Sequence, residues 1–192
     1  MVKIGFICEG DTEQILLLSD NFQLYLSSIN LQAVNVINAW GSGNLLPHNI
    51  TGYLQSLEQA GAQVIFILTD LDDDVCITQT KSRIKAREQD IMIIAIKKIE
   101  AWFLANDNSM RTLLGDMQFS FPSPETELNP FEIINALLVK YKGRGVGRTS
   151  AGKIKLVKKL VDVGFQLTES ANHNQCSSAR YFIDKLNQVG ER

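Results

Sequence analysis

The sequence predicts an α/β fold in which a four-stranded parallel sheet is covered by helices on both faces. In the first half of the chain, short apolar runs alternate with segments of helical periodicity, in the order strand, helix, strand, helix, strand, helix, strand. The apolar runs are almost uninterrupted, which is typical of parallel strands that are buried on both faces. The second half of the chain lacks such runs and predicts a helical extension.

Each predicted strand is short, apolar and closed by polar or glycine-containing residues. The four strands are expected at residues 2–8, 33–40, 62–68 and 91–96. Three helices are expected between them, at about residues 12–28, 46–60 and 78–88. Asp11 or Thr12 can cap the first helix, and Gly61 is placed to end the second.

Beyond the sheet, residues 98–105 predict a buried helix whose sole acid is Glu100. A short helix with a loop is expected at 106–121, helices at about 130–141, 151–163 and 177–188, and a loop at 165–176. We therefore predict an α/β domain over residues 1–105 and a helical extension over residues 106–192, packed on that domain.

The composition is that of an ordinary globular protein. The chain has 192 residues, of which 45% are hydrophobic and 21% charged, and its net charge of -2 indicates no particular partner. The three cysteines form no CxxC pair, so neither a disulfide framework nor a zinc site is predicted. No signal-peptide pattern and no apolar run of the ~18 residues that span a membrane are present. We expect a cytoplasmic protein without membrane contact, and oligomerisation stays open.

Acidic residues follow two of the predicted strands, where sites form in parallel sheets. Glu9 and Glu13 follow the first strand, and Asp70 and Asp72 follow the third. Carboxylate oxygens are ligands that magnesium prefers, so we predict Glu9, Asp70 and Asp72 as ligands of Mg²⁺ or Mn²⁺. Catalytic roles are predicted for Glu9, Glu13 and Glu100.

Each of these assignments has a structural alternative. The acidic loop can be solvated, and the acid after the first strand can cap a helix. Glu100 can form a buried pair with Lys97, Lys98 or a distant arginine. Asp73 and Asp74 are expected to be solvated or to lie outside the ligand set.

Bases dominate residues 133–161, which contain eight lysines and arginines and no acid. Such a stretch is typical of a surface that contacts a phosphate backbone, and its alternative is a solvated helical face. The predicted nucleic-acid contacts are Lys140, Lys142, Arg144, Arg148, Lys153 and Lys155. Residues 147–153 also match the start of a P-loop, but Ile154 replaces the Ser or Thr that binds magnesium, and the stretch follows a predicted helix. Nucleotide hydrolysis is therefore not expected there.

Three motifs carry a family resemblance that covers residues 1 to about 105. Residues 7–13 resemble the Glu-Gly-x-Thr-Glu signature of Toprim domains, and residues 70–72 resemble their Asp-x-Asp signature. Toprim domains are the catalytic folds of topoisomerases, DnaG-type primases and overcoming-lysogenisation-defect nucleases. Residues 98–105 resemble the Glu-Ala-Trp-Leu-Leu-Ala block of small bacterial Toprim-like proteins, classed as a domain of unknown function and akin to RloB-like proteins.

The resemblance implies a Toprim-like four-stranded parallel sheet. It implies that Asp70 and Asp72 bind magnesium and that Glu9 is a general acid/base or a metal ligand. Glu13 matches the second glutamate of the nuclease branch. The chain shows no ATPase domain, no tyrosine known to be placed for topoisomerase cleavage and no zinc module, which argues against a topoisomerase and a primase.

The sequence therefore predicts a divalent-metal-dependent nuclease that acts on DNA or RNA, in a phage-defence or mobile-element system. One alternative is a non-catalytic regulatory or binding component of a multi-protein system, whose acidic pocket binds an ion or a basic residue of a partner protein encoded nearby. Another is a protein that senses or transfers a nucleotide ligand on the same scaffold.

Overall fold

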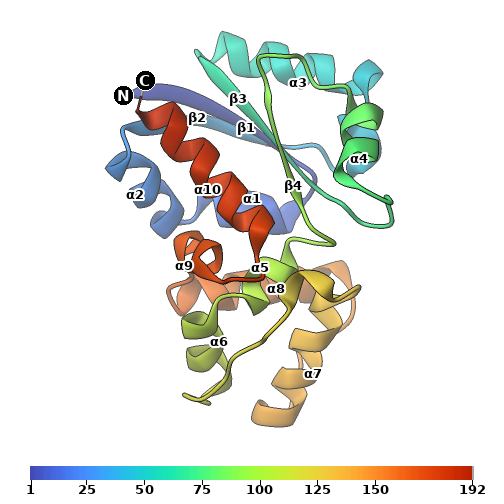
Figure 1. Cartoon of the computed structure of the whole chain (residues 1–192), viewed down its shortest axis with the longest axis vertical. Coiled ribbons are helices and arrows are strands. Elements are labelled where there is room, and N and C mark those ends of the chain that lie inside the picture. The colour runs from blue at the N-terminus through green and yellow to red at the C-terminus, as the bar shows by residue number, and fades with distance from the viewer. Residues whose placement is uncertain (192) are drawn as a thin grey trace. The chain divides into compact units, whose positions relative to one another are not determined.

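A computed structural model describes residues 1–191 and confirms the predicted α/β fold (Figure 1). Four parallel strands form one sheet in the order β2-β1-β3-β4. They are β1 (Val2–Cys8), β2 (Leu31–Asn38), β3 (Val64–Asp70) and β4 (Ile91–Ala95). In the register, Cys8 at the end of β1 lies opposite both Asn38 of β2 and Leu68 of β3. The carboxyl ends of these three strands therefore meet at one edge of the sheet.

Two neighbouring residues of β1 show that helices cover both faces of the sheet. Successive side chains of a strand point to opposite faces. A Cβ on Gly5 would lie 2.9 Å from Leu57 of α3 (Pro47–Gln59), so α3 packs closely on one face. The ring of Phe6 lies 5.9 Å from that of Phe22, which belongs to α2 (Asp20–Ser28), on the other face.

The first predicted helix is in fact two helices. α1 (Asp11–Leu18) ends before Ser19, whose backbone is extended with φ −65° and ψ 145°. The Ser19 hydroxyl accepts a hydrogen bond from the Phe22 N–H at 3.4 Å and caps α2. The prediction of one helix over residues 12–28 was wrong because a serine cap restarts the helix in its middle.

The chain forms two compact units. Unit 1 contains Met1–Ile94 and the chain from Asp184 to the end of the described residues, and unit 2 contains Ala95–Ile183. The predicted domains, residues 1–105 and 106–192, divide the chain at a later point and stay a prediction. Unit 1 also holds the 3-10 helix η1 (Ser42–Leu45) and α4 (Ile77–Ile84).

Unit 2 is built from helices around an aromatic core. The rings of Phe103 and Phe165 meet edge to face at 5.2 Å, and the Trp102 indole donates a hydrogen bond to the Ser178 hydroxyl at 2.7 Å. Its elements are α5 (Glu100–Leu104), α6 (Asp107–Leu114), η2 (Pro124–Thr126), α7 (Pro130–Lys142), α8 (Ser150–Asp162), α9 (Leu167–Asn172) and the first part of α10 (Ser177–Gly190). The loop predicted at residues 165–176 was wrong, because it contains α9.

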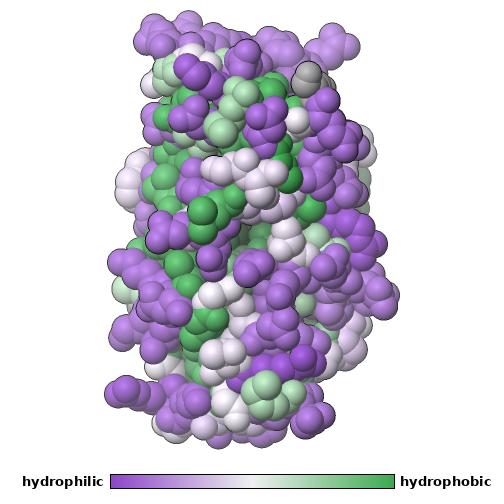
Figure 2. All heavy atoms as spheres, turned by 90° about the vertical axis from the view of Figure 1, so that its left-hand side faces the viewer, coloured by the Kyte–Doolittle hydropathy of each residue, from purple (hydrophilic) through white to green (hydrophobic). Residues whose placement is uncertain are grey.

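Hydrophilic side chains predominate on the face drawn in Figure 2, with apolar residues interspersed among them. On unit 1, Leu18 and Leu24 are 54% and 68% exposed, respectively. Scattered apolar residues of this kind are normal on protein surfaces. Of the helices in residues 1–191, none has the length and apolar character needed to cross a membrane.

Candidate active site

Glu9 follows β1, and its side chain is held against the end of β3. Its backbone N–H donates to the Leu68 carbonyl at 3.1 Å. Its carboxylate Oε2 accepts a hydrogen bond from the Thr69 hydroxyl at 2.7 Å and another from the Asp70 N–H at 3.3 Å. The parallel register thus brings Glu9 to the backbone of Asp70, although sixty residues separate them in the sequence.

Asp70 ends β3, and Asp72 lies inside the tight turn that follows it. Asp70 is the last residue of β3 and is 8% exposed. The Asp74 N–H donates to the Leu71 carbonyl at 3.0 Å, and Asp72, inside this turn, has a left-handed φ of 49°. Aspartate tolerates this conformation better than most residues. A tight turn with Asp72 inside it therefore follows β3 directly at the sheet edge.

Asp74 attaches this turn to α4. Its carboxylate accepts hydrogen bonds from the Thr80 hydroxyl at 2.8 Å and from Arg83 at 3.2 Å. These two contacts, that with Thr80 first, hold the pKa of Asp74 below its usual value. Asp74 thus has a structural role, whereas Asp73 is exposed.

Negative charge is concentrated where α1 begins. Gly10 is the N-cap, Asp11 and Glu13 lie in the first turn, and Glu13 is 5% exposed. The helix dipole favours acids at this position. Burial raises the pKa of the Cys8 thiol well above its ordinary value, and nearby carboxylates raise it further. These are, in decreasing order of effect, Glu13, Asp11 and Glu9.

The carboxylates at this edge fit a hard divalent cation by donor type. Mg²⁺ takes oxygen ligands and is usually held by one or two carboxylates, with water and phosphate oxygens as its other ligands. No group of three or more His, Cys, Asp or Glu residues that could together hold a metal ion occurs within residues 1–191. Within the described residues, Glu9, Asp70 and Asp72 are therefore not grouped as a three-ligand site.

Glu100 lies in unit 2, at the start of α5, and is 1% exposed. The Nζ of Lys153, on α8, lies 2.8 Å from its Oε1. The expected burial of Glu100 is thus confirmed, and Lys153 is a partner that the sequence did not suggest. The predicted catalytic role of Glu100 stays a prediction.

The predicted nucleic-acid contacts also lie in unit 2, on α7, α8 and the turn between them. The Arg148 side chain is 80% exposed and lies 3.3 Å from Glu132. Lys153 is 37% exposed and is paired with Glu100. The other four are exposed and form no ion pair with any residue of the described chain: Lys140, Lys142, Arg144 and Lys155.

Two residues that orient the acidic edge, Thr69 and Asn38, were missed in the sequence. Thr69 binds Glu9, and the buried Asn38 amide donates to Asp11 at 2.9 Å and accepts from the Trp40 N–H at 2.8 Å. Their position at the ends of predicted strands could have identified them, because the carboxyl ends of parallel strands lie at one edge of the sheet. Thr69 and Asn38 orient the acidic segments.

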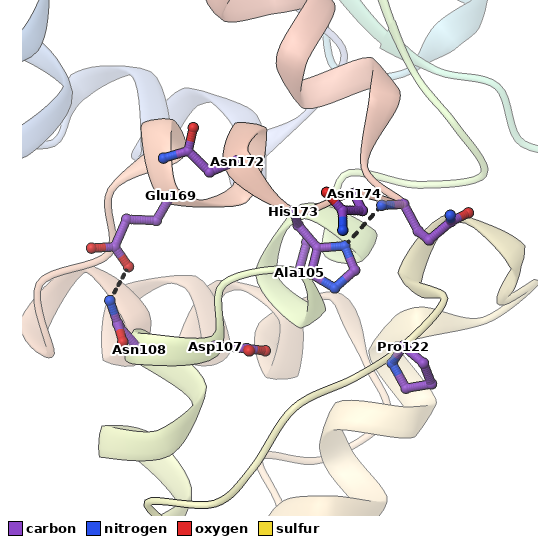
Figure 3. A pocket seen from close by; sticks show the side chains of 9 residues that line it. Ala105, Asp107, Asn108, Pro122, Glu169, Asn172, His173 and Asn174 are labelled. Carbon is purple, nitrogen blue, oxygen red and sulfur yellow. Dashed lines mark hydrogen bonds between the residues drawn. The ribbon is translucent and has the colours of Figure 1, made fainter.

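A separate pocket of about 600 Å³ lies in unit 2 (Figure 3). The Glu169 carboxylate accepts from the Asn108 amide at 2.6 Å, and His173 Nδ1 accepts from the Gln175 N–H at 3.1 Å. His173 Nε2 therefore carries the proton and donates to the Phe121 carbonyl at 2.9 Å. The lining residues include two acids and no lysine or arginine, so the pocket does not fit a phosphate group.

No protein-family model matches the chain, and no curated protein matches it. Among solved structures, the chain is similar to the C-terminal region of the Burkholderia pseudomallei OLD protein, with 12% sequence identity and a TM-score of 0.47. The similarity covers 99% of each of the two chains.

Proposed function

We propose that this chain is a nucleic-acid phosphodiesterase that depends on Mg²⁺ or Mn²⁺. The observation that carries the proposal is the position of the Glu9 carboxylate, which binds the Thr69 hydroxyl and the Asp70 N–H. It supports a site in which acids from two strands act together. The resemblance of residues 7–13 and 70–72 to the Toprim signatures supports the same chemistry.

Asp70 and Asp72 would hold the metal ion: Asp70 ends β3, and Asp72 lies in the turn that directly follows it. Glu9 would join them as a ligand through Oε1, while its Oε2 keeps the hydrogen bonds with Thr69 and Asp70. When bound, a divalent ion supplies positive charge that polarises a phosphodiester and lowers the pKa of a bound water. Glu13, in the first turn of α1, adds negative charge at the same edge.

Glu9 is also suited to move a proton. Thr69 and Asp70 occupy its Oε2 and fix the orientation of the carboxylate, while Oε1 has no hydrogen bond or ion pair within the described residues. A carboxylate held in this way can accept a proton from an attacking water, and a general base typically contributes about 10²–10⁴-fold to a rate.

The exposed bases of unit 2 would contact the phosphate backbone. Lys140, Lys142, Arg144 and Lys155 are not neutralised by acids of the described chain, so their charge is available to a polyanion. Arg148 can exchange Glu132 for phosphate, because their side chains are 80% and 44% exposed and such pairs are weak. Lys153 is held by Glu100 and would contribute least.

Cleavage of single- and double-stranded DNA and RNA with Mg²⁺ or Mn²⁺ tests the proposal. We expect Asp70→Asn and Asp72→Asn to abolish cleavage, and Glu9→Gln to lower the rate about 10²–10⁴-fold. Asp73→Asn is the matched control, because Asp73 is the exposed neighbour in the same turn. Cleavage without divalent ions, or equal losses in Asp70→Asn and Asp73→Asn, would contradict the proposal.

The second candidate is a non-catalytic component of a multi-protein system. It is favoured by the finding that, in the part of the chain that the structure describes, no three ligating residues are grouped for a metal ion. The acidic edge would then bind basic residues of a partner protein. Stable capture of that partner, lost in Asp70→Asn and accompanied by no cleavage, would support this function.

A further inference from the structure

Trp40 combines an exposed side chain with a backbone conformation that tryptophan rarely adopts. The residue is 72% exposed, and its φ is 59°. Left-handed φ in a bulky residue is an outlier with an energetic cost. The indole forms no hydrogen bond and no ring contact with another described residue, so packing does not offset this cost.

Hydrogen bonds of the surrounding chain hold Trp40 in this conformation. Its N–H donates to the Asn38 side-chain oxygen at 2.8 Å. The Asn44 amide donates to the Ala39 carbonyl at 2.7 Å, and the Gly41 N–H donates to the Glu9 carbonyl at 2.8 Å. The segment is therefore ordered, and it presents the indole to solvent from a fixed backbone.

This segment lies beside the acidic edge in the same unit. The Ala39 N–H donates to the Cys8 carbonyl at 2.8 Å, and the Gly41 N–H donates to the Glu9 carbonyl at 2.8 Å, so both neighbours of Trp40 are bonded to the chain at the end of β1. Adjacent strands are about 5 Å apart. The Trp40 backbone thus lies about one strand spacing from the residue that begins the acidic site.

We infer that Trp40 is a stacking platform for an unpaired base of a nucleic acid bound at the acidic edge. The inference rests on the proposed function and adds to it a preference for single-stranded or locally opened substrate. An indole face stacks on any base without requiring a counter-charge. The acids around it would repel a phosphate but not a neutral base, so the base fits this position better than the backbone does.

Intrinsic fluorescence tests the inference without requiring cleavage. The chain has two tryptophans, and Trp102 is fully buried, so Trp40 is the tryptophan that solvent and ligands reach. In EDTA, we expect a thymidine oligonucleotide to quench the emission of the intact chain, and a fully paired duplex to quench it much less. The quenching should disappear in Trp40→Phe.

Affinity measurements with two substitutions separate stacking from folding. Trp40→Gly removes the ring and suits a positive φ, so the fold should be kept. We expect it to bind the oligonucleotide about 5- to 150-fold more weakly, which corresponds to ~1–3 kcal/mol. Trp40→Phe should recover most of the affinity, and Leu24→Ala, at an exposed apolar residue of the same unit, should bind as the intact chain does.

The outcomes distinguish this inference from the proposed function. Cleavage that persists while Trp40→Gly binds normally would overturn the stacking role and leave the nuclease intact. Binding that depends on Trp40, with no cleavage by the intact chain, would support stacking and overturn the nuclease. Emission that responds to a captured protein and to no oligonucleotide would overturn the inference in favour of a protein contact.

Discussion

The Nζ of Lys153 lies 2.8 Å from Oε1 of Glu100, and this ion pair joins α8 to α5 inside unit 2. Glu100 is 1% exposed, and neither of its carboxylate oxygens has a hydrogen-bond partner within residues 1–191. A buried carboxylate is costly unless it is paired. The lysine therefore compensates the only charged side chain of α5.

Removal of the Lys153 ammonium should destabilise the protein. We expect Lys153→Met to lower the free energy of unfolding by about 2 kcal/mol, less than the 3–5 kcal/mol typical of fully buried pairs, because Lys153 is 37% exposed. Chemical denaturation measures this loss. Lys155→Met is the matched control, since Lys155 is exposed on the same helix; equal losses in both variants would contradict the role of the pair.

The position of the acids at one edge of the sheet was predictable, because the carboxyl ends of parallel strands lie at the same edge. An acid after the first strand and two acids after the third must lie near one another if β1 and β3 are neighbours. The order β2-β1-β3-β4 makes them neighbours, and Glu9 then binds Thr69 and Asp70. The apolar runs and the residues at their ends were therefore sufficient to predict that these acids lie at one edge of the sheet.

Other features depend on tertiary contacts that local patterns do not encode. The apolar neighbours of Glu100 predicted its burial, but Lys153 comes from a distant helix. The short helix α9 is stabilised from outside, since the Ser170 hydroxyl donates to the Trp102 carbonyl at 2.7 Å. The left-handed backbone of Trp40, which ends β2 early at Asn38, likewise depends on side-chain hydrogen bonds.

Tyr25 should make the free energy of unfolding decrease at alkaline pH. Burial raises its pKa from 10.0 to about 12, against the effect of the hydrogen bond with Asn187 at 2.9 Å. The folded state holds the phenol proton of Tyr25 more tightly than the unfolded state does. The contribution of Tyr25 to the free energy of unfolding is therefore complete below pH 10 and is lost between about pH 10 and 12. After allowance for partial exposure we expect a loss of about 1–2 kcal/mol.

Denaturation of the intact chain and of Tyr25→Phe at several pH values measures this effect. Tyr25→Phe should be less stable at pH 8 by about 1 kcal/mol, because it lacks the hydrogen bond to Asn187. Its stability should fall less steeply above pH 10. Parallel pH profiles of the two proteins would show that Tyr25 has no such effect.

The three cysteines should differ in their reaction with an aromatic disulfide reagent. Cys8 and Cys176 are fully buried, whereas Cys76 is exposed at the start of α4. We expect one thiol to react quickly in the native protein and all three in denaturant, because a buried thiol is reached only after unfolding. The variant Cys76→Ser should show no fast phase. A fast phase that persists in this variant would reveal local opening around one of the buried thiols.

The exposed bases of unit 2 should determine how salt weakens nucleic-acid binding. Each phosphate contact contributes about 0.9 to the slope of log affinity against log salt for duplex DNA and about 0.7 for single strands. We expect the triple variant Lys140→Ala/Lys142→Ala/Arg144→Ala to reduce the magnitude of this slope by about 2–3. These three residues have no ion pair in the described chain, so each can contact a phosphate. Titrations at several salt concentrations measure it. Lys81→Ala, at an exposed base of α4, is the control and should leave the slope unchanged. If the triple variant kept the slope of the intact chain, this basic stretch would be a solvated face and the phosphate contacts would lie elsewhere.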